Sequence, residues 1–600
     1  MSAIANVINA VEEHGRFVEG QVRKARKDKN FATDLLARWR EISLNIDTIE
    51  TPAGLKLPRL ALPQTDEPGE IARFLFEEGM PGEFPFVTAA YPEMYLQHPQ
   101  TGQGSDSRKH PGKSNHTAVQ SEEPTRLFAG LGLAEDTNRR FHYLTQHQKT
   151  IRLSTAFDGP TLYGMDSDED GVLGKVGEGG VAVDTMEDME RLFDRFPLGD
   201  EHFSVSMTIN GPAPIILAMY VAAAQRRFGK GVVSKLRGTV QADILKEVQA
   251  QNEIIFPIEA SLRFLTDMVE FTTAHMPRWY PISISGYHIA EAGATPVQQA
   301  AFTLSNGFAY AEMFQARGMA VDRFAPRLSF FLDCGLDLEY VALGRVCRKL
   351  WAIGMRDVFH ARPSGQKLKL HTQTSGRSLI ASEYKNNMTR TALELLLACA
   401  NATNSCHSNS ADEPFTTPSE EYVRLAAHAQ AILLEESGLF KLMMNTLAGS
   451  PGMKIVERAL EKAILDEFRQ IDQLGGVLAA TELRYQRSQI QAAAHRYEKQ
   501  INDGVRPVIG WNRYGDRSAH LPEVKVIRTP RSKQDLQVAR LKKFKKTHRT
   551  QAAQALERLS KAVASGGNVF AELLKTVEHC SLGQITSHLQ EQVGRFRPMV

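Results

Sequence analysis

The densest group of side chains that could carry out chemistry lies at residues 283–295, which read SISGYHIAEAGAT. A single histidine at the end of a strand is most often structural, with its hydrogen bonds satisfied. Here His288 follows Gly286 and Tyr287 and stands just before Glu291. We therefore take this segment as the first candidate for a functional site.

Other catalytic motifs give no competing candidate. The sequence has no phosphate-binding G-x-x-x-x-G-K-[ST] loop, no convincing G-x-G-x-x-G after a strand, and no recognisable serine or cysteine nucleophile. Asp166, Asp168 and Asp170 resemble a calcium loop only loosely, because the glutamate at the twelfth position is missing, and we interpret them as a solvated loop. The sequence contains no C-x-x-C pair, so we predict no metal ligand in this chain.

Short strand-like segments must position the candidate site, and they alternate with longer helical patterns. This alternation predicts an α/β fold of the (β/α)8 TIM-barrel type, in which chemistry takes place at the carboxyl ends of the strands. The eight predicted strands are 84–89, 153–158, 203–210, 239–241, 280–288, 327–333, 367–376 and 405–413. The main helices are predicted at 213–228, 259–276, 295–317, 336–358, 382–400 and 417–436.

The interiors of several strands are unusually polar. SVSMT, SISGYH and LHTQTSG carry small hydroxyl residues where a filled barrel would carry Val, Ile and Leu. One interpretation is a barrel with room for a ligand along its axis. The other is a set of partly exposed strands, and spacing alone does not separate the two.

Three regions are predicted along the chain. They are an N-terminal helical segment and linker (1–70), the barrel (71–440) and a C-terminal helical region (441–600). Residues 97–121 carry almost no large apolar side chains and are predicted to form a mobile loop within the barrel. The basic stretch 540–549 is interpreted as a solvated helix face rather than a docking or nucleic-acid surface.

Composition narrows the class of protein further. Lys and Arg number 71 against 69 for Asp and Glu, so bulk charge suggests no nucleic-acid or membrane partner. No apolar run approaches the roughly 20 residues that span a bilayer, and the N-terminus does not read as a signal peptide. The five cysteines are scattered, which fits a reducing compartment. We therefore expect a cytoplasmic protein.

Six further segments, in order along the chain, carry a family resemblance together with 283–295. They are RLSTAFDGPTLYGMDSD (152–168), SVSMTINGPAP (204–214), GTVQADILKE (238–247), FAPRLSFF (324–331), HTQTSGRSL (371–379) and HSNSADE (407–413). The chain thus resembles the methylmalonyl-CoA mutase family over about 120–440 and, more weakly, to the C-terminus. The resemblance independently implies the barrel fold.

This resemblance also implies an enzyme, an isomerase that uses adenosylcobalamin for a radical 1,2-migration of an acyl-CoA thioester group. The implied catalytic residues are His288, which would hydrogen-bond the migrating thioester carbonyl, and Tyr287, which would shield the radical pair. Gln241 and Thr239 match positions near the acyl group. Residues that match the CoA channel are Ser154, Phe157, Ser206, Thr208, Arg327, Ser329, Phe331 and Gln373. Arg126 matches a CoA-gripping segment, and Asn404 and Glu413 match positions that face the adenosyl group and the corrin, although Asn404 stands where the family usually has Gln.

Two positions bear on the acyl group. The family binds the free carboxylate of methylmalonyl-CoA with an Arg and a Tyr, and the matching residues here are Gln251 and Phe128. The replacement of that Arg and Tyr argues for an uncharged acyl group. Together with Arg377 and the stretch 139–144, it resembles the isobutyryl-CoA mutase branch, which interconverts isobutyryl-CoA and n-butyryl-CoA. Alternatives are a mutase for methylmalonyl-CoA or another branched acyl-CoA (isovaleryl or pivalyl), or a non-catalytic subunit. Phe128 could also be a core aromatic.

The resemblance implies partners as well. The cobalt-ligating D-x-H-x-x-G motif of the family is absent, and the nearest string, Asp200-Glu201-His202, lacks the glycine. We therefore expect a separate cobalamin-binding small subunit, and hence a hetero-oligomer. A GTPase chaperone is a further possible partner.

Overall fold

The computed structural model describes residues 2–45, 48–51, 53–58, 60–92, 94, 127–146, 148–440, 450–515 and 528–596. Its centre is a set of parallel strands. They are β3 (Leu127–Ala129), β4 (Ile151–Ala156), β5 (Phe203–Thr208), β6 (Gly238–Val240), β7 (Trp279–Tyr280), β8 (Ile282–Ser285), β9 (Leu328–Cys334), β10 (Lys369–Thr374) and β11 (Ser405–His407). The loop 97–121 and Arg126 lie outside the described residues.

The strands follow one another in chain order across two sheets, β3-β4-β5-β6-β7 and β8-β9-β10-β11. Pro281 separates β7 from β8, and its missing N–H interrupts the ladder of hydrogen bonds there. The two sheets stay connected at this point, because the backbone N–H of Ser283 donates to the carbonyl of Gln241 at 2.9 Å. The order of strands is therefore the order expected for a barrel.

Helices fill the connections between these strands, and the predicted α/β class is confirmed. The main connecting helices are α4 (Ala134–Thr145), α6 (Met186–Leu192), α7 (Ala213–Phe228), α9 (Ile258–His275), α10 (Tyr287–Glu291), α11 (Pro296–Ala316), α13 (Leu343–Asp357) and α15 (Asn387–Ala400), and α16 (Glu420–Ala431) follows β11. The shorter ones are α5 (Gly159–Leu162), α8 (Ile244–Lys246), α12 (Val321–Phe324) and α14 (Pro363–Gln366). All six helices predicted above appear, and α7 has the predicted bounds.

The first predicted strand is wrong. Residues 84–89 form no strand, and the first strand of the sheet is β3, which the sequence did not indicate. The buried guanidinium of Arg348 donates to the carbonyls of Phe86 and Val87 at 2.8 and 2.7 Å. An arginine side chain thus satisfies backbone groups that a neighbouring strand would otherwise have bonded.

The closed barrel is not seen in the hydrogen-bond ladders. Within the described residues these ladders leave β3 and β11 as the two edges of the strand series. The edges nevertheless approach each other through side chains, because the rings of Phe128 on β3 and His407 on β11 lie 5.3 Å apart between centroids. The structure therefore establishes the parallel α/β arrangement, without a ladder across this seam.

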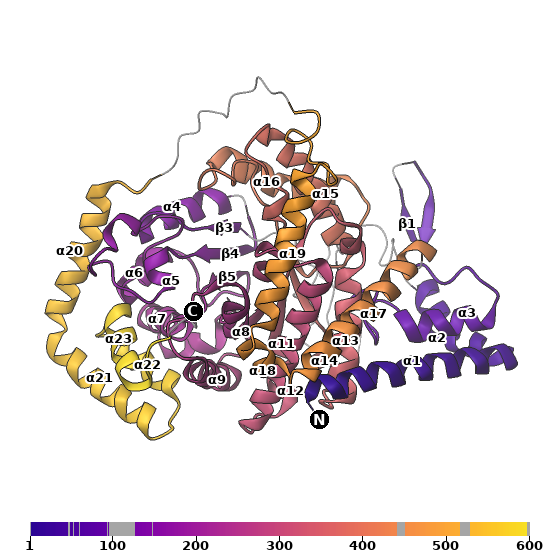
Figure 1. Cartoon of the computed structure of the whole chain (residues 1–600), viewed down its shortest axis with the longest axis horizontal. Helices are drawn as coiled ribbons and strands as arrows, with labels where there is room; N and C mark the ends of the chain where they lie inside the picture. Colours follow the sequence, from indigo (N-terminus) through magenta and orange to yellow (C-terminus); the bar gives the residue numbers. More distant parts are fainter. Residues whose placement is uncertain are drawn as a thin grey trace.

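Helices from both ends of the chain pack around the strands, and the N-terminal helices lie at the opposite end of the molecule from the last four helices (Figure 1). The N-terminal elements are α1 (Ala3–Lys27), α2 (Lys29–Asn45), β1 (Thr48–Glu50), β2 (Lys56–Pro58) and α3 (Pro68–Arg73). The C-terminal helices are α17 (Pro451–Gln473), α18 (Val477–Glu482), α19 (Tyr485–Asn502), α20 (Arg531–Thr547), α21 (Arg549–Ala564), α22 (Val569–Thr576) and α23 (Leu582–Val593). Apolar residues of both groups join the core cluster of the strands. None of the described helices has the length and apolarity needed to cross a bilayer.

The basic stretch 540–549 lies mostly on α20 and is not wholly a solvated face. Lys545 forms ion pairs with Asp166 at 2.8 Å and Asp168 at 2.6 Å. Asp166 also accepts from the hydroxyl of Ser581 and the N–H of Gly583. The interpretation of Asp166 as part of a solvated loop is therefore wrong, because this carboxylate is a buried anchor for the C-terminal helices.

Candidate functional site

One face of the parallel strands is polar and partly accessible. The register places Phe128, Ser154, Ser206, Thr239 and Tyr280 side by side on β3 to β7. Apart from Ser154 these residues keep some exposure, whereas the alternating neighbours, such as Leu153 and Val205, are fully buried under the helices. Because side chains alternate between the two faces of a strand, this inner face is distinct from the apolar core.

Most of the predicted lining residues share this inner face. The register adds Thr208 on β5, and Ser329, Phe331 and Gln373 on β9 and β10. Between them lie two histidines that the sequence analysis missed, His371 and His407. Small hydroxyl side chains therefore leave the inner face partly exposed, which both interpretations of the polar strands expect.

Tyr287 and His288 open α10, directly after β8, at the carboxyl edge of the strands. Gly286 makes this position possible, since a Cβ at residue 286 would overlap Thr303 and Leu332. The ring of Tyr287 stacks on Phe331, with centroids 4.8 Å apart and planes 8° apart. The aromatic pair thus holds the start of α10 over the end of the inner face.

One nitrogen of the His288 imidazole is hydrogen-bonded to a hydroxyl of the preceding strand. Its Nδ1 lies 2.7 Å from Oγ of Ser285. Burial, and then the positive charge of Lys246, lowers the pKa of His288 well below 6.5. The ring is therefore neutral at neutral pH and offers one nitrogen as a donor and the other as an acceptor.

Tyr287 is held by polar groups at the same edge. Gln373 donates to its hydroxyl oxygen at 3.0 Å and to the side-chain carbonyl of Asn409 at 2.8 Å. Burial, then the nearby carboxylate of Glu291, raises the pKa of Tyr287 well above 10. Tyr287 is therefore a neutral hydrogen-bonding group.

The structure places Asn404 away from this edge. Both its backbone N–H and its side-chain carbonyl bond Leu370, near the amino end of β10. The asparagine that reaches the site is Asn409, which also donates to the carbonyl of Thr374 at 2.8 Å. Asn409, five residues further along, is therefore the asparagine at the carboxyl edge, and the assignment of Asn404 to the adenosyl side stays a prediction.

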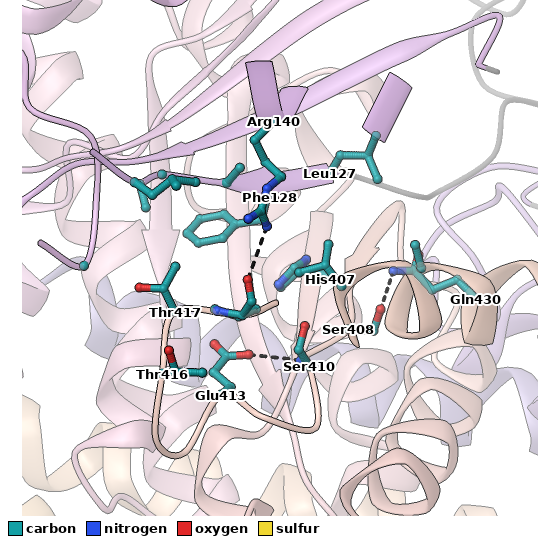
Figure 2. A pocket seen from close by; sticks show the side chains of 18 residues that line it. Leu127, Phe128, Arg140, His407, Ser408, Ser410, Glu413, Thr416, Thr417 and Gln430 are labelled. Carbon is teal, nitrogen blue, oxygen red and sulfur yellow. Dashed lines mark hydrogen bonds between the residues drawn. The ribbon is translucent and has the colours of Figure 1, made fainter. Parts of the chain in front are cut away.

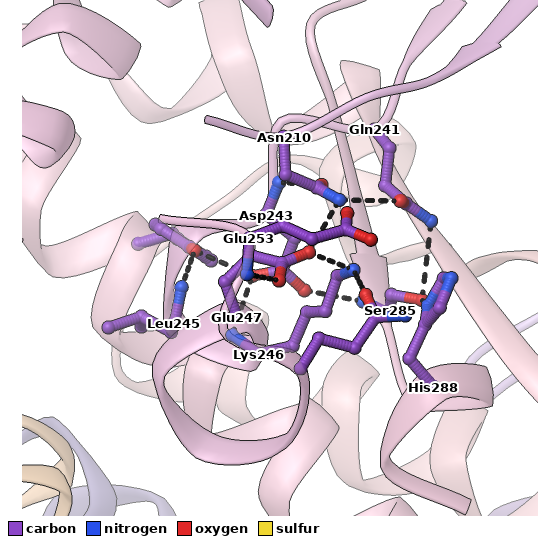
Figure 3. Close-up of polar contacts among 11 residues, drawn as sticks. Asn210, Gln241, Asp243, Leu245, Lys246, Glu247, Glu253, Ser285 and His288 are labelled. Carbon is purple, nitrogen blue, oxygen red and sulfur yellow. Dashed lines mark hydrogen bonds and ion pairs between the residues drawn. The ribbon is translucent and has the colours of Figure 1, made fainter. Parts of the chain in front are cut away.

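A buried polar network lies beside His288 (Figure 3). Gln251 joins this network through Lys246. The side chain of Lys246 is 0 % exposed and donates to Oε1 of Gln251, and it forms an ion pair with Glu247. Asn210 joins Glu247 to Gln241, with distances of 2.6 and 3.0 Å. In a sequence, an adjacent Lys and Glu ordinarily indicate a solvent-exposed position. The sequence therefore did not predict this buried network.

Phe128 lies in different surroundings, in a cavity of about 290 Å³ between the edge strands β3 and β11 (Figure 2). The cavity is mostly apolar and includes His407 and Glu413. Glu413 accepts from the N–H of Ser410 at 3.1 Å, and burial raises its pKa to about 7. A carboxyl group in a mostly apolar cavity suits a ligand that has both apolar and hydrogen-bonding parts.

This raised pKa predicts a specific pH dependence. The folded protein holds a proton on Glu413 that the unfolded chain releases above pH 4.5, so stability is lost as pH rises from 4.5 to about 7. We expect the fall in Tm between pH of about 5 and about 8 to be smaller in Glu413→Gln than in the wild type. The exposed Glu435→Gln serves as control, and identical pH profiles for the wild type and Glu413→Gln would refute the assignment.

Two further predicted residues lie off the centre of the inner face. Phe157 is 3 % exposed, belongs to the core cluster and forms a bridge with Val181. Arg327 stands at the amino end of β9 and donates to the carbonyl of Thr273 at 2.7 Å. The structure thus gives Phe157 a packing role, while Arg327 is a cation at the opposite end of the inner face from His288.

The fold and site together define a parallel α/β protein whose polar strand face leads to a neutral Tyr–His pair. A family model described as methylmalonyl-CoA mutase matches residues 63–595, so the chain belongs to the methylmalonyl-CoA mutase family. This confirms the resemblance seen in the sequence.

Three relatives illustrate the range of this family. The chain is 43% identical to a fused isobutyryl-CoA mutase of Geobacillus kaustophilus over 595 residues, which are 95% of this chain and 52% of that protein. It is 40% identical to a 2-hydroxyisobutanoyl-CoA mutase large subunit of Aquincola tertiaricarbonis over 73% of each chain. It is 41% identical to the methylmalonyl-CoA mutase of Escherichia coli over 65% of this chain and 54% of that one. The chain spans about half the length of the fused relatives.

Proposed function

We propose that this chain binds a branched, uncharged acyl-CoA and interconverts isobutyryl-CoA and n-butyryl-CoA with adenosylcobalamin. The observation that carries the proposal is the polar inner face, which runs along the strands and ends at the neutral ring of His288. Relatives that are 43% identical and named isobutyryl-CoA mutases support the same substrate. Relatives named for methylmalonyl-CoA and 2-hydroxyisobutanoyl-CoA define the substrates to compare.

The CoA part of the substrate would lie along the inner face. Its pantetheine arm needs a narrow path with hydrogen-bonding groups, which Ser154, Ser206 and Thr239 offer. Arg327 and Lys369 stand at the amino ends of β9 and β10, where cations suit phosphate groups. We further propose that the strands close as a (β/α)8 barrel around this path, within a unit of residues 71–440.

His288 would hold the thioester carbonyl. A neutral imidazole that donates a hydrogen bond stabilises the negative charge that develops on this oxygen during migration. Tyr287, stacked on Phe331 above the end of the inner face, would exclude water from the same place.

The acyl group would be uncharged because, among the residues that the structure describes, the cation beside Gln251 is already paired. Lys246 is already paired with Glu247 and with Oε1 of Gln251. A substrate carboxylate buried beside Gln251 without a cation of its own would cost several kcal/mol, a selectivity of about 10²-fold or more.

The carboxyl edge fits the adenosyl side of the cofactor. Gln373, Asn409 and Glu413 present hydrogen-bonding groups there, and Glu413 is a buried acid beside an open cavity. When bound, adenosylcobalamin supplies the radical that removes a substrate hydrogen. Because residues 1–600 lack the D-x-H-x-x-G motif, we propose that a unit outside them ligates the cobalt.

The names of the relatives suggest two ways in which a cobalt-ligating unit could be attached. Some are named fused mutases, and one is named a large subunit. The separate small subunit expected from sequence, and with it a hetero-oligomer, corresponds to the second pattern. A GTPase partner also stays a prediction.

Blocking the inner face should weaken substrate binding. We expect Ser206→Phe to raise the Kd for isobutyryl-CoA by at least about tenfold, because the ring would fill the middle of the path (about 1.4 kcal/mol). Isothermal titration of the chain without cobalamin measures this directly. Ser234→Phe, at an exposed position, is the matched control, and equal Kd values for the two variants would contradict the path.

Reconstitution tests the whole function. The chain is combined with a cobalamin-binding unit of this family and adenosylcobalamin, and isobutyryl-CoA is supplied. We expect n-butyryl-CoA as product, with methylmalonyl-CoA turned over at least about 10²-fold more slowly. Comparable rates for the two substrates would contradict the role of Gln251, and turnover of neither would contradict the proposed reaction.

A further inference from the structure

A chain of side-chain hydrogen bonds runs from Glu247 to His288 through three neutral residues (Figure 3). Nδ2 of Asn210 donates to Glu247 at 2.6 Å and to Oε1 of Gln241 at 3.0 Å. Nε2 of Gln241 donates to Oγ of Ser285 at 3.5 Å, and this oxygen lies 2.7 Å from Nδ1 of His288. The chain links the loops after β5 and β6 with Glu247, β8 and α10.

In the first hydrogen bond, between Asn210 and Glu247, the donor and the acceptor are fixed by the neighbouring groups. Glu247 is an acceptor, because Lys246 and the backbone N–H of Glu253 also donate to it. On its other side, Asn210 accepts from the backbone N–H of Asp243 at 3.0 Å, and a backbone N–H can only donate. The amide of Asn210 therefore has one orientation, with its NH2 group toward Glu247 and Gln241.

This direction passes along the chain to the imidazole. Because Asn210 donates to Gln241, the amide of Gln241 turns its own NH2 group toward Ser285. The oxygen of Ser285 then accepts this bond, and its proton is free for Nδ1 of His288. A neutral imidazole that accepts at Nδ1 carries its proton on Nε2.

We propose that Asn210 is a positioning residue that selects the tautomer of His288 with the proton on Nε2. The ring then presents a donor, rather than a lone pair, to the thioester carbonyl. This inference rests on the proposed function for what His288 touches, whereas the tautomer itself follows from the hydrogen-bond chain.

The scaffold around the chain is also held by bonds that do not involve Asn210. The N–H of Ser285 donates to Oδ2 of Asp243 at 2.7 Å, and the hydroxyl of Tyr310 donates to Oδ1 at 2.6 Å. These bonds hold the ends of β6 and β8 together. The side chain at 210 can therefore change character while Ser285 and His288 keep their places.

Asn210→Asp tests the proposal, because it keeps the shape and reverses the polarity. The new carboxyl group shares a proton with Glu247 and offers only an acceptor to Gln241. Gln241 should flip, Ser285 should donate to it, and His288 should carry its proton on Nδ1. We expect ¹⁵N NMR of histidine-labelled protein, without cobalamin, to show this tautomer, with the His288 signal assigned through His288→Gln.

Turnover in the reconstituted enzyme gives the second readout. We expect kcat to fall by about 10²–10³-fold, as for loss of one oxyanion donor, with little change in KM. The exposed Asn30→Asp on α2 controls for the added charge. Ser285→Ala cuts the chain, so Asn210→Asp should have no further effect on the tautomer or on kcat in that background.

The outcomes separate the two claims. An unchanged tautomer in Asn210→Asp would overturn the inference, as would additive effects in the double variant. If Asn210→Asp does not fold, Ser285→Ala alone must lower the population protonated on Nε2, or the inference fails. An inverted tautomer with unchanged turnover would support the chain and contradict the role of His288 in the proposed function.

Discussion

Replacement of His288 by alanine is expected to lower the turnover of isobutyryl-CoA by at least about 10²-fold while substrate binding is kept. The reason is that His288 stands at the carboxyl edge of the strands, beyond the inner face that would hold the CoA arm. Its neutral ring would contribute to the transition state and little to the affinity of the ground state. Turnover of the reconstituted enzyme and titration of the chain with isobutyryl-CoA measure the two effects separately.

A matched control is His495→Ala, at an exposed position on α19, which should leave both quantities unchanged. If His288→Ala kept the wild-type rate, the residue would have no place in the mechanism. If instead affinity and rate fell together, His288 would be a binding residue and the division of roles along the inner face would be wrong.

Replacement of Lys246 by methionine should have the largest effect on stability. Both members of the Lys246–Glu247 pair are 0 % exposed. Removal of the ammonium leaves a buried carboxylate without its counterion, which destabilises a protein by about 3–5 kcal/mol. We expect a correspondingly lower midpoint of denaturant unfolding, while Lys542→Met on the exposed face of α20 should change it little.

The double variant Lys246→Met/Glu247→Leu distinguishes pairing from packing. If the loss in Lys246→Met comes from the unpaired charge, removing Glu247 as well should recover part of the stability. Additive losses would show that the two side chains contribute through separate contacts.

Helices and most strands could be predicted from the sequence because their apolar spacing is regular. α7 begins and ends where its pattern predicts, and the polar alternation of β5 gave the inner face. β3 could not be predicted because it is only three residues long and follows a polar stretch. Residues 84–89 have a strand-like composition, but Arg348, from far along the chain, bonds their carbonyls.

The site, too, could be predicted from the sequence only in part. Tyr287 and His288 stand in a recognisable segment, so the sequence located them. Asn404 stands before β11 and Asn409 after it, and only the strand register shows which of them reaches Gln373. The burial of Lys246 could not be predicted, because an adjacent Lys and Glu ordinarily lie in solvent.

The central claim is that an acyl-CoA lies along the inner face with its thioester carbonyl on His288. Isotope-edited infrared spectroscopy of isobutyryl-CoA labelled with ¹³C at this carbonyl tests it without cobalamin. We predict that binding shifts the carbonyl band to lower frequency in the wild type, because a hydrogen bond weakens the C=O bond, and that the shift is lost in His288→Ala. Saturating binding that leaves the band unshifted, or a shift that survives in His288→Ala, would contradict the account.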